Sequence, residues 1–388
     1  MKILFLSIVP TGDLYLSLAD EFSKNNHQVT YVTPTEEETH WDIFNGHNIL
    51  FFHAGRMLNV SIPRKGINNL LFPKYCLKAV KKYIIPTDYQ LILMSTPPLG
   101  YLSSIRWLKK NNPSIKFYEI LRDIHPEGTT HILKKIPGLY GYFKRQAQEL
   151  YTLADIIGCM SPFDVELVKK NYILQNPDKV QLLPNWGRVE SCHQPSEEVR
   201  KKYGLDGKFM IIYGGNMGKP QNLPLFLKLA KEKQHYEDVL FFFIGSGTER
   251  EKLREIVRTE NIKNVRIENQ IPHEDYQHVL RCASLGIITL SMTQFFANCP
   301  SKAVTYWQNK IPVLASLDHV TDFGTYFLDR SKSGLWSFAD DYQSLSDNFD
   351  KLYSNTELRK EMGENGYKFF RDNYTVDKTY YNIINSLN

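Results

Sequence analysis

Short apolar runs alternate with stretches of helical spacing along the first half of the chain. The run Lys2–Val9 stops at a Thr-Gly-Asp turn, which predicts a buried strand. The stretch 14–26 then places Leu14, Leu18 and Phe22 on one helical face. Further strand-like runs are Gln28–Val32, Ile49–Phe52, Leu91–Met94, Ile115–Ile120 and Ile156–Cys159. This alternation predicts a parallel sheet covered by helices.

The same alternation starts again after a polar stretch. We interpret that stretch, residues 187–208, as a linker between two domains. Strand-like runs return at Phe209–Tyr213, Leu240–Ile244, Val265–Glu268, Leu285–Leu290 and Val313–Ala315, and helical stretches fit Leu223–Lys233, Glu249–Arg258, His273–Cys282 and Ser301–Gln308. The sequence therefore predicts an α/β protein with two Rossmann-like parallel-sheet domains, residues 1–186 and 209–370, and a final helical segment, 371–388. Ligands of such sheets bind beyond the carboxyl ends of the strands.

Composition places the chain among folded globular proteins. It has 388 residues, of which 42% are hydrophobic and 23% are charged, and these values exclude a disordered or collagen-like chain. Its five cysteines are scattered and form no Cys-x-x-Cys pair, so neither a disulfide framework nor a cysteine zinc site is predicted. No apolar run reaches the roughly 18 residues of a membrane-spanning helix. The apolar start is short for a signal peptide, so we expect a cytoplasmic protein.

The net charge of +5 lies entirely in the first half. Residues 1–186 hold 21 Lys and Arg against 16 Asp and Glu, and the remainder holds 26 of each. So small an excess argues against a nucleic-acid partner and fits one face turned toward an anionic ligand or lipid surface. Between residues 56 and 86 the basic side chains have no acidic neighbour in sequence: Arg56, Arg64, Lys65, Lys74, Lys78, Lys81 and Lys82. The last four share one helical face, which is either solvated or docks on anionic lipid.

Two glycine-rich turns follow predicted strands of the second domain. The strand Phe209–Tyr213 runs into Gly-Gly-Asn-Met-Gly-Lys, where glycine lets a ligand approach the backbone and Lys219 adds a positive charge. Gly245 begins a similar Gly-Ser-Gly turn before a helix. Neither turn has the spacing of a dinucleotide fingerprint or of a phosphate loop. A purely structural role for both turns stays open.

The start of the predicted helix at 301–308 carries another lysine. Pro300 precedes Ser301, a residue type that favours the N-cap position. Lys302 in the first turn is disfavoured by the helix dipole, and a bound diphosphate would relieve that penalty. The alternative is a solvated surface lysine.

An aspartate and a histidine follow a predicted strand of the first domain. Asp123 and His125 come soon after Ile115–Ile120, so we expect them at the carboxyl edge of the sheet, where each can accept a proton from a sugar hydroxyl. The alternative for Asp123 is an ion pair with Arg122. The other histidines show no metal-ligand spacing and no Asp-x-Asp occurs, so no metal site is predicted.

Taken together, these motifs resemble those of family 4 of the retaining glycosyltransferases, which have the GT-B fold. The resemblance is closest to the branch that builds bacterial capsule, O-antigen and exopolysaccharide. The matching segments follow the family's order over nearly the whole chain: Asn26–Thr30, Thr96–Pro98, Arg122–Glu127, Pro184–Trp186, Gly215–Lys219, Gly245–Gly247, Pro300–Lys302, Tyr306 and Pro312–Val313. The resemblance implies two domains that face each other across a cleft, with the helix of 371–388 returning to the first domain.

The resemblance also implies a site for a nucleotide-diphospho-sugar, with a UDP-sugar favoured and no further cofactor or metal. Lys219 and Lys302 would contact the diphosphate, and Gly215 would allow its close approach. The other positions that the resemblance implies at the donor are Gly12, Asn216, Gly245, Gln270, Ile271, Ser301 and Thr305.

The activity that the resemblance implies is retaining transfer of a hexosyl or N-acetylhexosaminyl group. The acceptor would be a hydroxyl of a lipid-diphosphate-linked saccharide in bacterial surface polysaccharide biosynthesis. Asp123, His125 and Lys302 would be the catalytic residues. The enzyme would act as a peripheral protein at the inner face of the membrane.

The chain departs from the family at two pairs of positions. Many family members carry Glu-x7-Glu where this chain has Ala297 and Thr305. Others carry Arg and Lys where it has Asn216 and Gln221. Two alternatives therefore stay open: a nucleotide-sugar 2-epimerase of GT-B fold, and a non-catalytic GT-B partner in a polysaccharide assembly complex.

Overall fold

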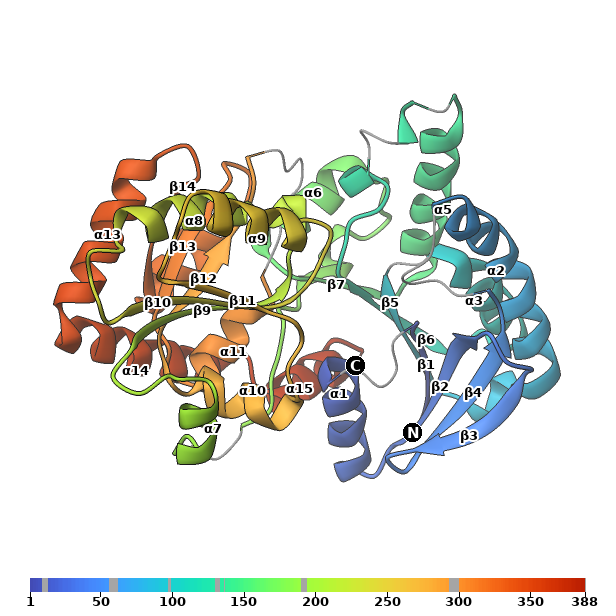
Figure 1. Cartoon of the computed structure of the whole chain (residues 1–388). Helices are drawn as coiled ribbons and strands as arrows, with labels where there is room; N and C mark the ends of the chain where they lie inside the picture. Colours follow the sequence, from blue (N-terminus) through green and yellow to red (C-terminus); the bar gives the residue numbers. More distant parts are fainter. Residues whose placement is uncertain are drawn as a thin grey trace. The chain divides into compact units, whose positions relative to one another are not determined.

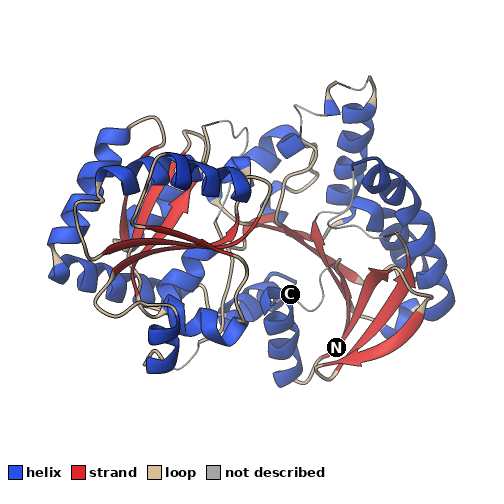
Figure 2. Cartoon of the chain, viewed as in Figure 1, coloured by secondary structure: helices blue, strands red, loops and turns tan. Residues whose placement is uncertain are grey.

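The computed structural model describes residues 1–8, 13–55, 62–96, 99–129, 133–135, 137–189, 194–292 and 300–387. The chain divides into two compact units, Met1–Trp186 with Val376–Asn388, and Gly187–Thr375 (Figure 1). Each unit is built on one sheet with helices packed against it (Figure 2). No helix of these residues is long and apolar enough to cross a membrane. The predicted α/β fold with two Rossmann-like parallel-sheet domains is confirmed.

The first unit contains an eight-stranded sheet in the order β3-β4-β2-β1-β5-β6-β7-β8. Its strands are β1 (Lys2–Leu6), β2 (Gln28–Thr35), β3 (His40–Phe44), β4 (His47–His53), β5 (Leu91–Thr96), β6 (Lys116–Leu121), β7 (Ile156–Cys159) and β8 (Val180–Leu182). Neighbouring strands are parallel except for the antiparallel hairpin of β3 and β4. Neither edge strand of this sheet is predicted by the apolar pattern: the residues of β3 are mostly exposed, and β8 has only three residues.

Strand β1 shows why the central strands of this sheet form. Residues Ile3–Leu6 have no exposed surface, and continuous apolar runs are typical of strands buried on both faces. α1 (Asp13–Lys24) and α15 (Val376–Leu387) share one core with the sheet. The helices that pack in the core of the opposite face are α2 (Ile62–Tyr83), α3 (Leu102–Asn111), α5 (Leu139–Leu153) and α6 (Pro162–Asn171).

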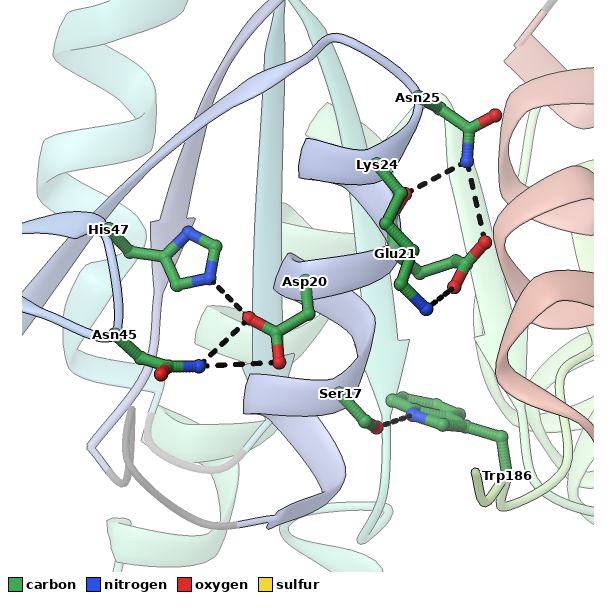
Figure 3. A network of polar contacts seen from close by, with 8 residues as sticks. All are labelled: Ser17, Asp20, Glu21, Lys24, Asn25, Asn45, His47 and Trp186. Atoms are coloured by element: carbon green, nitrogen blue, oxygen red, sulfur yellow. Dashed lines mark hydrogen bonds and ion pairs between the residues drawn. The ribbon is translucent and has the colours of Figure 1, made fainter. Parts of the chain in front are cut away.

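Polar contacts tie α1 to its neighbours in the first unit (Figure 3). Asp20 of α1 contacts His47 of the β3–β4 hairpin, with Oδ1 2.7 Å from Nε2. Trp186 donates its indole N–H to the carbonyl of Leu14 at 2.8 Å. These contacts fix α1 against the hairpin and against the last residue of the unit before the chain enters the second unit.

The second unit contains a six-stranded parallel sheet in the order β11-β10-β9-β12-β13-β14. Its strands are β9 (Phe209–Asn216), β10 (Val239–Ser246), β11 (Val265–Glu268), β12 (Ala283–Thr289), β13 (Val313–Leu317) and β14 (Gly334–Phe338). Its helices are α7 (Glu197–Lys202), α8 (Leu223–Glu232), α9 (Arg250–Thr259), α10 (His273–Leu280), α11 (Lys302–Gln308), α12 (Asp329–Ser331), α13 (Tyr342–Ser354) and α14 (Thr356–Asn373).

Short helical turns connect several of these elements. They are η1 (Pro86–Asp88), η2 (Leu99–Tyr101), η3 (Glu127–Thr129), η4 (Pro177–Lys179), η5 (Lys219–Gln221) and η6 (Phe323–Leu328). Three of them contain residues discussed below: η3 contains Glu127, η4 contains Lys179 and η5 contains Lys219.

The segment 187–208, which we interpreted as a linker, is part of the second unit where the structure describes it. It contains α7, whose N-cap Ser196 accepts the Val199 N–H. Tyr203, at the end of α7, donates its hydroxyl to Asp275 of α10 at 2.8 Å. Gly187 donates its N–H to the Tyr374 carbonyl at 2.9 Å, so residues up to Thr375 also belong to this unit. The chain returns to the first unit at Val376, the first residue of α15.

Candidate functional site

The two glycine-rich turns lie side by side at the carboxyl ends of β9 and β10. Gly215 pairs with Gly245 in the parallel register. Both have left-handed backbones, with φ of +129° and +147°. A Cβ on Gly245 would lie 2.0 Å from the Gly215 carbonyl oxygen, so a side chain there is impossible without a backbone shift. The glycines therefore let two strand ends approach closely and leave bare backbone at this edge.

Lys302 lies directly beside that bare backbone. A Cβ on Gly215 would be 3.2 Å from Cε of Lys302 and 3.5 Å from its Nζ. The Lys302 ammonium lies 4.8 Å from the ring centroid of Tyr213. The structure brings Lys302 and Gly215 together, as the resemblance implied, although they are 87 positions apart in the sequence.

The environment of Lys302 favours an anion. Among the described residues no carboxylate pairs with this ammonium. Lys302 is half-buried as a residue, and desolvation of its ammonium by the surrounding protein lowers its pKa from 10.5 to about 8. A buried ammonium that lacks a counter-charge gains free energy when an anion arrives. The alternative of a freely solvated surface lysine therefore does not describe this side chain.

The helix that begins at Lys302 is anchored in the core of the second unit. The Tyr306 hydroxyl lies 3.2 Å from the carbonyl oxygens of Ile212 in β9 and Ile287 in β12. The Tyr306 ring occupies the space in which a Cβ of Gly286 would stand, at 2.5 Å. A buried hydroxyl held by strand carbonyls fixes α11 relative to β9, and so fixes Lys302 relative to Gly215.

Ser301 occupies the predicted N-cap position of α11 but does not cap the helix. Its backbone is already helical, with φ −60° and ψ −24°, and its hydroxyl accepts no helical N–H. An N-cap side chain needs an extended backbone to reach those N–H groups. Thr305, one turn further along α11, is half-buried.

Lys219 lies on the same turn as Gly215 but in a different setting. It begins η5, is exposed, and forms no hydrogen bond or ion pair with another described residue. The turn itself is held together by Gln221, whose Oε1 accepts from the Gly218 N–H at 3.3 Å and from Asn216 Nδ2 at 3.4 Å. The Asn216 side chain therefore supports the turn, whereas no described residue pairs with the Lys219 ammonium.

Gln270 and Ile271 lie at the same edge of the sheet, one strand further out. β11 pairs with β10 in the register Ile244 to Glu268, and Gln270 follows two residues later. Gln270 is exposed and Ile271 is half-buried. Arg254 supports this loop, since its Nη2 donates to the Ile267 carbonyl at 3.2 Å.

Gly12 and Ala297 lie outside the described residues, as do Val9, Arg56 and the two prolines of Thr96–Pro98. Among the residues that the structure describes, no three His, Cys, Asp or Glu side chains are grouped so as to hold a metal ion.

Asp123 belongs to the first unit, on the turn that follows β6. The backbone N–H groups of Arg122 and Asp123 donate to the Thr96 carbonyl at 3.3 and 3.4 Å. No ion pair joins Arg122 to Asp123; the Arg122 guanidinium instead lies 6.0 Å from the Trp186 ring. The alternative of an ion pair for Asp123 is therefore wrong. Asp123 is an exposed residue, but the protein around its carboxyl partly desolvates it and so raises its pKa, while the Arg122 charge opposes that shift.

His125 lies on the same turn and packs against α5. Its ring lies edge-on to Phe143 with 5.0 Å between the centroids. Burial lowers the pKa of His125, and the nearby Glu127 carboxylate opposes that shift. Tyr172 supports the turn from α6, because its hydroxyl donates to Glu127 Oε2 at 2.7 Å and lies 3.3 Å from the His125 carbonyl oxygen. A neutral imidazole is the form that accepts a proton.

The sequence analysis missed Glu119, a buried acid directly before this turn. Glu119 has no exposed surface, and its Oε1 accepts the Thr96 hydroxyl at 2.5 Å. Its only signal in the sequence is one acidic residue inside an otherwise apolar strand, Phe117–Leu121.

The second unit also matches a known domain. Residues 195–369 match the family model described as "Glycosyl transferases group 1". This match lies within the second unit. No curated protein sequence matches the chain.

Solved structures match the whole chain in fold. Sucrose-phosphate synthase from Thermosynechococcus elongatus has a TM-score of 0.75 and 14% identity, covering 99% of this chain and 98% of that chain. HepE from Anabaena, in complex with UDP, has a TM-score of 0.71 and 13% identity, covering 100% and 99%. WaaG, a glycosyltransferase involved in lipopolysaccharide biosynthesis, has a TM-score of 0.70 and 13% identity, covering 98% and 99%. The chain has the GT-B fold, and its match to the group 1 family model lies in the second unit.

Proposed function

We propose that this protein transfers a sugar from a nucleotide-diphospho-sugar, with a UDP-sugar favoured, and that its donor site lies at Gly215 and Lys302. The observation that carries this proposal is the buried, unpaired Lys302 ammonium beside the bare backbone of Gly215. The group 1 domain supports it, because the domain spans both residues. The UDP in the HepE structure supports the choice of base.

The chemistry of such a donor suits these residues. Breaking the bond between sugar and diphosphate leaves negative charge on the leaving phosphate oxygen. The Lys302 ammonium is held in place by α11 and stabilises that charge more in the transition state than in the ground state. Lys219 adds a second charge from the neighbouring turn, and no metal ion or further cofactor is required.

The acceptor side of the reaction belongs to the first unit in this proposal. Asp123 and His125 follow β6, and each can accept a proton. Asp123 does so through its carboxylate, and His125 through its imidazole, which burial keeps neutral. The reaction retains the anomeric configuration and transfers a hexosyl or N-acetylhexosaminyl group. These features rest on the resemblance to family 4.

The acceptor is a lipid-diphosphate-linked saccharide of a bacterial surface polysaccharide, and the protein works at the inner face of the membrane. Support comes from the outward face of α2 and from Ile85, two residues beyond its end. The apolar side chains Leu70, Leu71 and Ile85 are 72%, 39% and 61% exposed. The same face carries the exposed lysines Lys74, Lys78, Lys81 and Lys82, and α2 contains no acidic residue. Exposed apolar groups among lysines fit the interface of an anionic bilayer.

The donor half of the proposal is tested by thermal shift against the diphosphates of uridine, guanosine, thymidine, adenosine and cytidine and their sugars. A ligand at about 100 times its Kd adds about 2.7 kcal/mol to the free energy of unfolding, which gives a clear shift. We expect a base-selective shift with uridine nucleotides. No shift with any nucleotide would contradict the donor site and favour a non-catalytic role. Formation of an epimer from donor alone would favour a nucleotide-sugar 2-epimerase.

The membrane half is tested by flotation with vesicles of phosphatidylglycerol and phosphatidylcholine at low and high salt. We expect salt-sensitive binding that is lost when Lys78 and Lys82 are both replaced by Glu. Lys110, an exposed lysine in the last turn of α3, is the matched control, and Lys110→Glu should leave binding unchanged. Flotation that ignores salt and the double substitution would contradict docking through α2.

A further inference from the structure

A buried glutamate lies under the turn that carries Asp123. Glu119 is on β6, and its side chain has no exposed surface. Its Oε1 accepts the Thr96 hydroxyl at 2.5 Å. Its Oε2 is buried and has no hydrogen-bond partner. A carboxylate in this position would hold a full negative charge on a single hydrogen bond, which is a costly arrangement in a protein interior.

The groups that face Glu119 do not balance such a charge. Lys179 approaches from η4, but its ammonium donates to the carbonyls of Tyr151 at 2.6 Å and Ala154 at 2.9 Å and forms no ion pair with Glu119. Tyr151 faces it from α5 and Cys159 from β7, and both are buried and uncharged. Burial therefore raises the pKa of Glu119 from 4.5 to about 8, and the carboxyl is mainly neutral at pH 7.

Thr96 connects this carboxyl to the turn. Thr96 is the last residue of β5, and its partner in the register of β6 is Leu121. Its hydroxyl holds Glu119, and its carbonyl accepts the N–H groups of Arg122 and Asp123. The same residue therefore joins the buried acid on one side to the backbone of the turn on the other.

We propose that Glu119 in its neutral form is a positioning residue that holds Thr96, and through Thr96 the turn of residues 122–129, in place. Loss of its proton puts a charge in the core below the turn. The turn can open to water, because it already carries an exposed residue, Asp123. Deprotonation therefore loosens the turn and displaces Asp123. The consequence for sugar transfer rests on the proposed function, whereas the change in the turn does not.

The direct test is hydrogen–deuterium exchange of the whole chain from pH 6.5 to 9.5, followed by peptides covering 122–129. Observed rates are divided by the intrinsic base-catalysed rates. With a pKa of about 8, the ionised fraction of Glu119 rises about tenfold between pH 7 and pH 9. We expect the corrected exchange of 122–129 to rise by a similar factor in the wild type and to stay flat in Glu119→Gln. Peptides covering 245–250 in the second unit are the internal control.

A second pair of variants covers the case in which Glu119→Gln does not fold. Thr96→Val removes the hydroxyl and should raise the corrected exchange of 122–129 already at pH 7, whereas Thr96→Ser keeps the hydroxyl and should behave as the wild type. A flat wild-type profile, an equal rise in Glu119→Gln, or identical Thr96 variants would overturn the proposal.

Activity is read separately from the turn. If sugar transfer is present, its decline above pH 8 should be smaller in Glu119→Gln, while affinity for UDP is unchanged because the donor residues lie in the second unit. An equal decline in both proteins would contradict the coupling to Asp123. Absence of transfer at every pH, together with the expected exchange profile, would contradict the proposed function and support the inference about the turn.

Discussion

Replacing Lys302 by Met should stabilise the nucleotide-free protein. Burial shifts the pKa of this lysine from 10.5 to about 8, a change of about 2.5 units. At about 1.4 kcal/mol per unit, the buried ammonium destabilises the fold by at most about 3.5 kcal/mol. Because the side chain is partly exposed, we expect Lys302→Met to raise the free energy of unfolding at pH 7 by about 1–3 kcal/mol. Methionine keeps an apolar stem of similar length over Tyr213.

The pH dependence of this gain has a fixed sign. The folded pKa of Lys302 lies below the unfolded value, so the unfolded state binds more protons between pH 8 and 10.5. Wild-type stability therefore rises through that interval relative to Lys302→Met. The advantage of the variant is complete below pH 8 and shrinks toward pH 10.5. Urea unfolding at pH 7 and pH 10 measures both values.

The same substitution should weaken nucleotide binding. A diphosphate supplies the counter-charge that Lys302 lacks, and losing one charge-assisted contact costs about 1.5–3 kcal/mol, or about 10- to 150-fold in Kd. Calorimetric titration with UDP measures this loss. The matched control is Lys228→Met, because Lys228 also lies over a tyrosine ring, that of Tyr342, but is exposed. Destabilisation of the free protein by Lys302→Met, together with unchanged UDP affinity, would refute the reasoning.

Three further substitutions test the site. Gly215→Ala should weaken UDP binding at least tenfold, because its Cβ would crowd Lys302 at 3.2 Å on a backbone with φ +129°. The control is Gly46→Ala, since Gly46 also has a left-handed backbone but no atom within 4 Å of an added Cβ, and its affinity for UDP in the same titration should be unchanged. Equal losses of affinity in the two variants would contradict the contact. Tyr306→Phe should lower the free energy of unfolding in urea by about 1–3 kcal/mol, since the carbonyls of Ile212 and Ile287 lose the hydroxyl that they share. A change below about 0.5 kcal/mol would show that this hydroxyl does not anchor α11. Asp123→Asn should lower kcat for transfer by about 100-fold or more and leave UDP affinity intact; the opposite pattern would place Asp123 outside the proton transfer.

The central strands of both sheets were predictable because most of their residues are buried, whereas β3, β8 and β14, which lie at sheet edges, were missed. The edge strand β11 was predicted although its residues are only half-buried. β1, β5 and β9 are continuous apolar runs, which identify a central parallel strand without further context. β3 has no such signal, because four of its five residues are exposed and its pairing depends on the hairpin that joins it to β4. Edge strands of this kind take their structure from their neighbours rather than from their own apolar pattern.

The candidate site was predictable in its parts but not in its assembly. Glycines after predicted strands indicated where the backbone is bare, and Lys302 was recognisable at a helix start. Its burial, and its position against Gly215, depend on the anchoring of Tyr306 beneath β9 and β12, which no local pattern encodes. Glu119 was hidden for a related reason. A single acidic residue in a strand is normally expected to face solvent, and only the packing of α5 over β6 shows that Glu119 is buried.

The central claim is that this chain moves a sugar from a nucleotide donor by means of Lys302. The most direct measurement follows a radiolabelled sugar from a panel of UDP-sugars into lipid-diphosphate-linked saccharides extracted from bacterial membranes, with wild type, Lys302→Ala and Lys228→Ala in parallel. The account predicts transfer from at least one donor by the wild type and by Lys228→Ala, and a loss of about 100-fold or more in Lys302→Ala. Transfer at the wild-type rate by Lys302→Ala would contradict it.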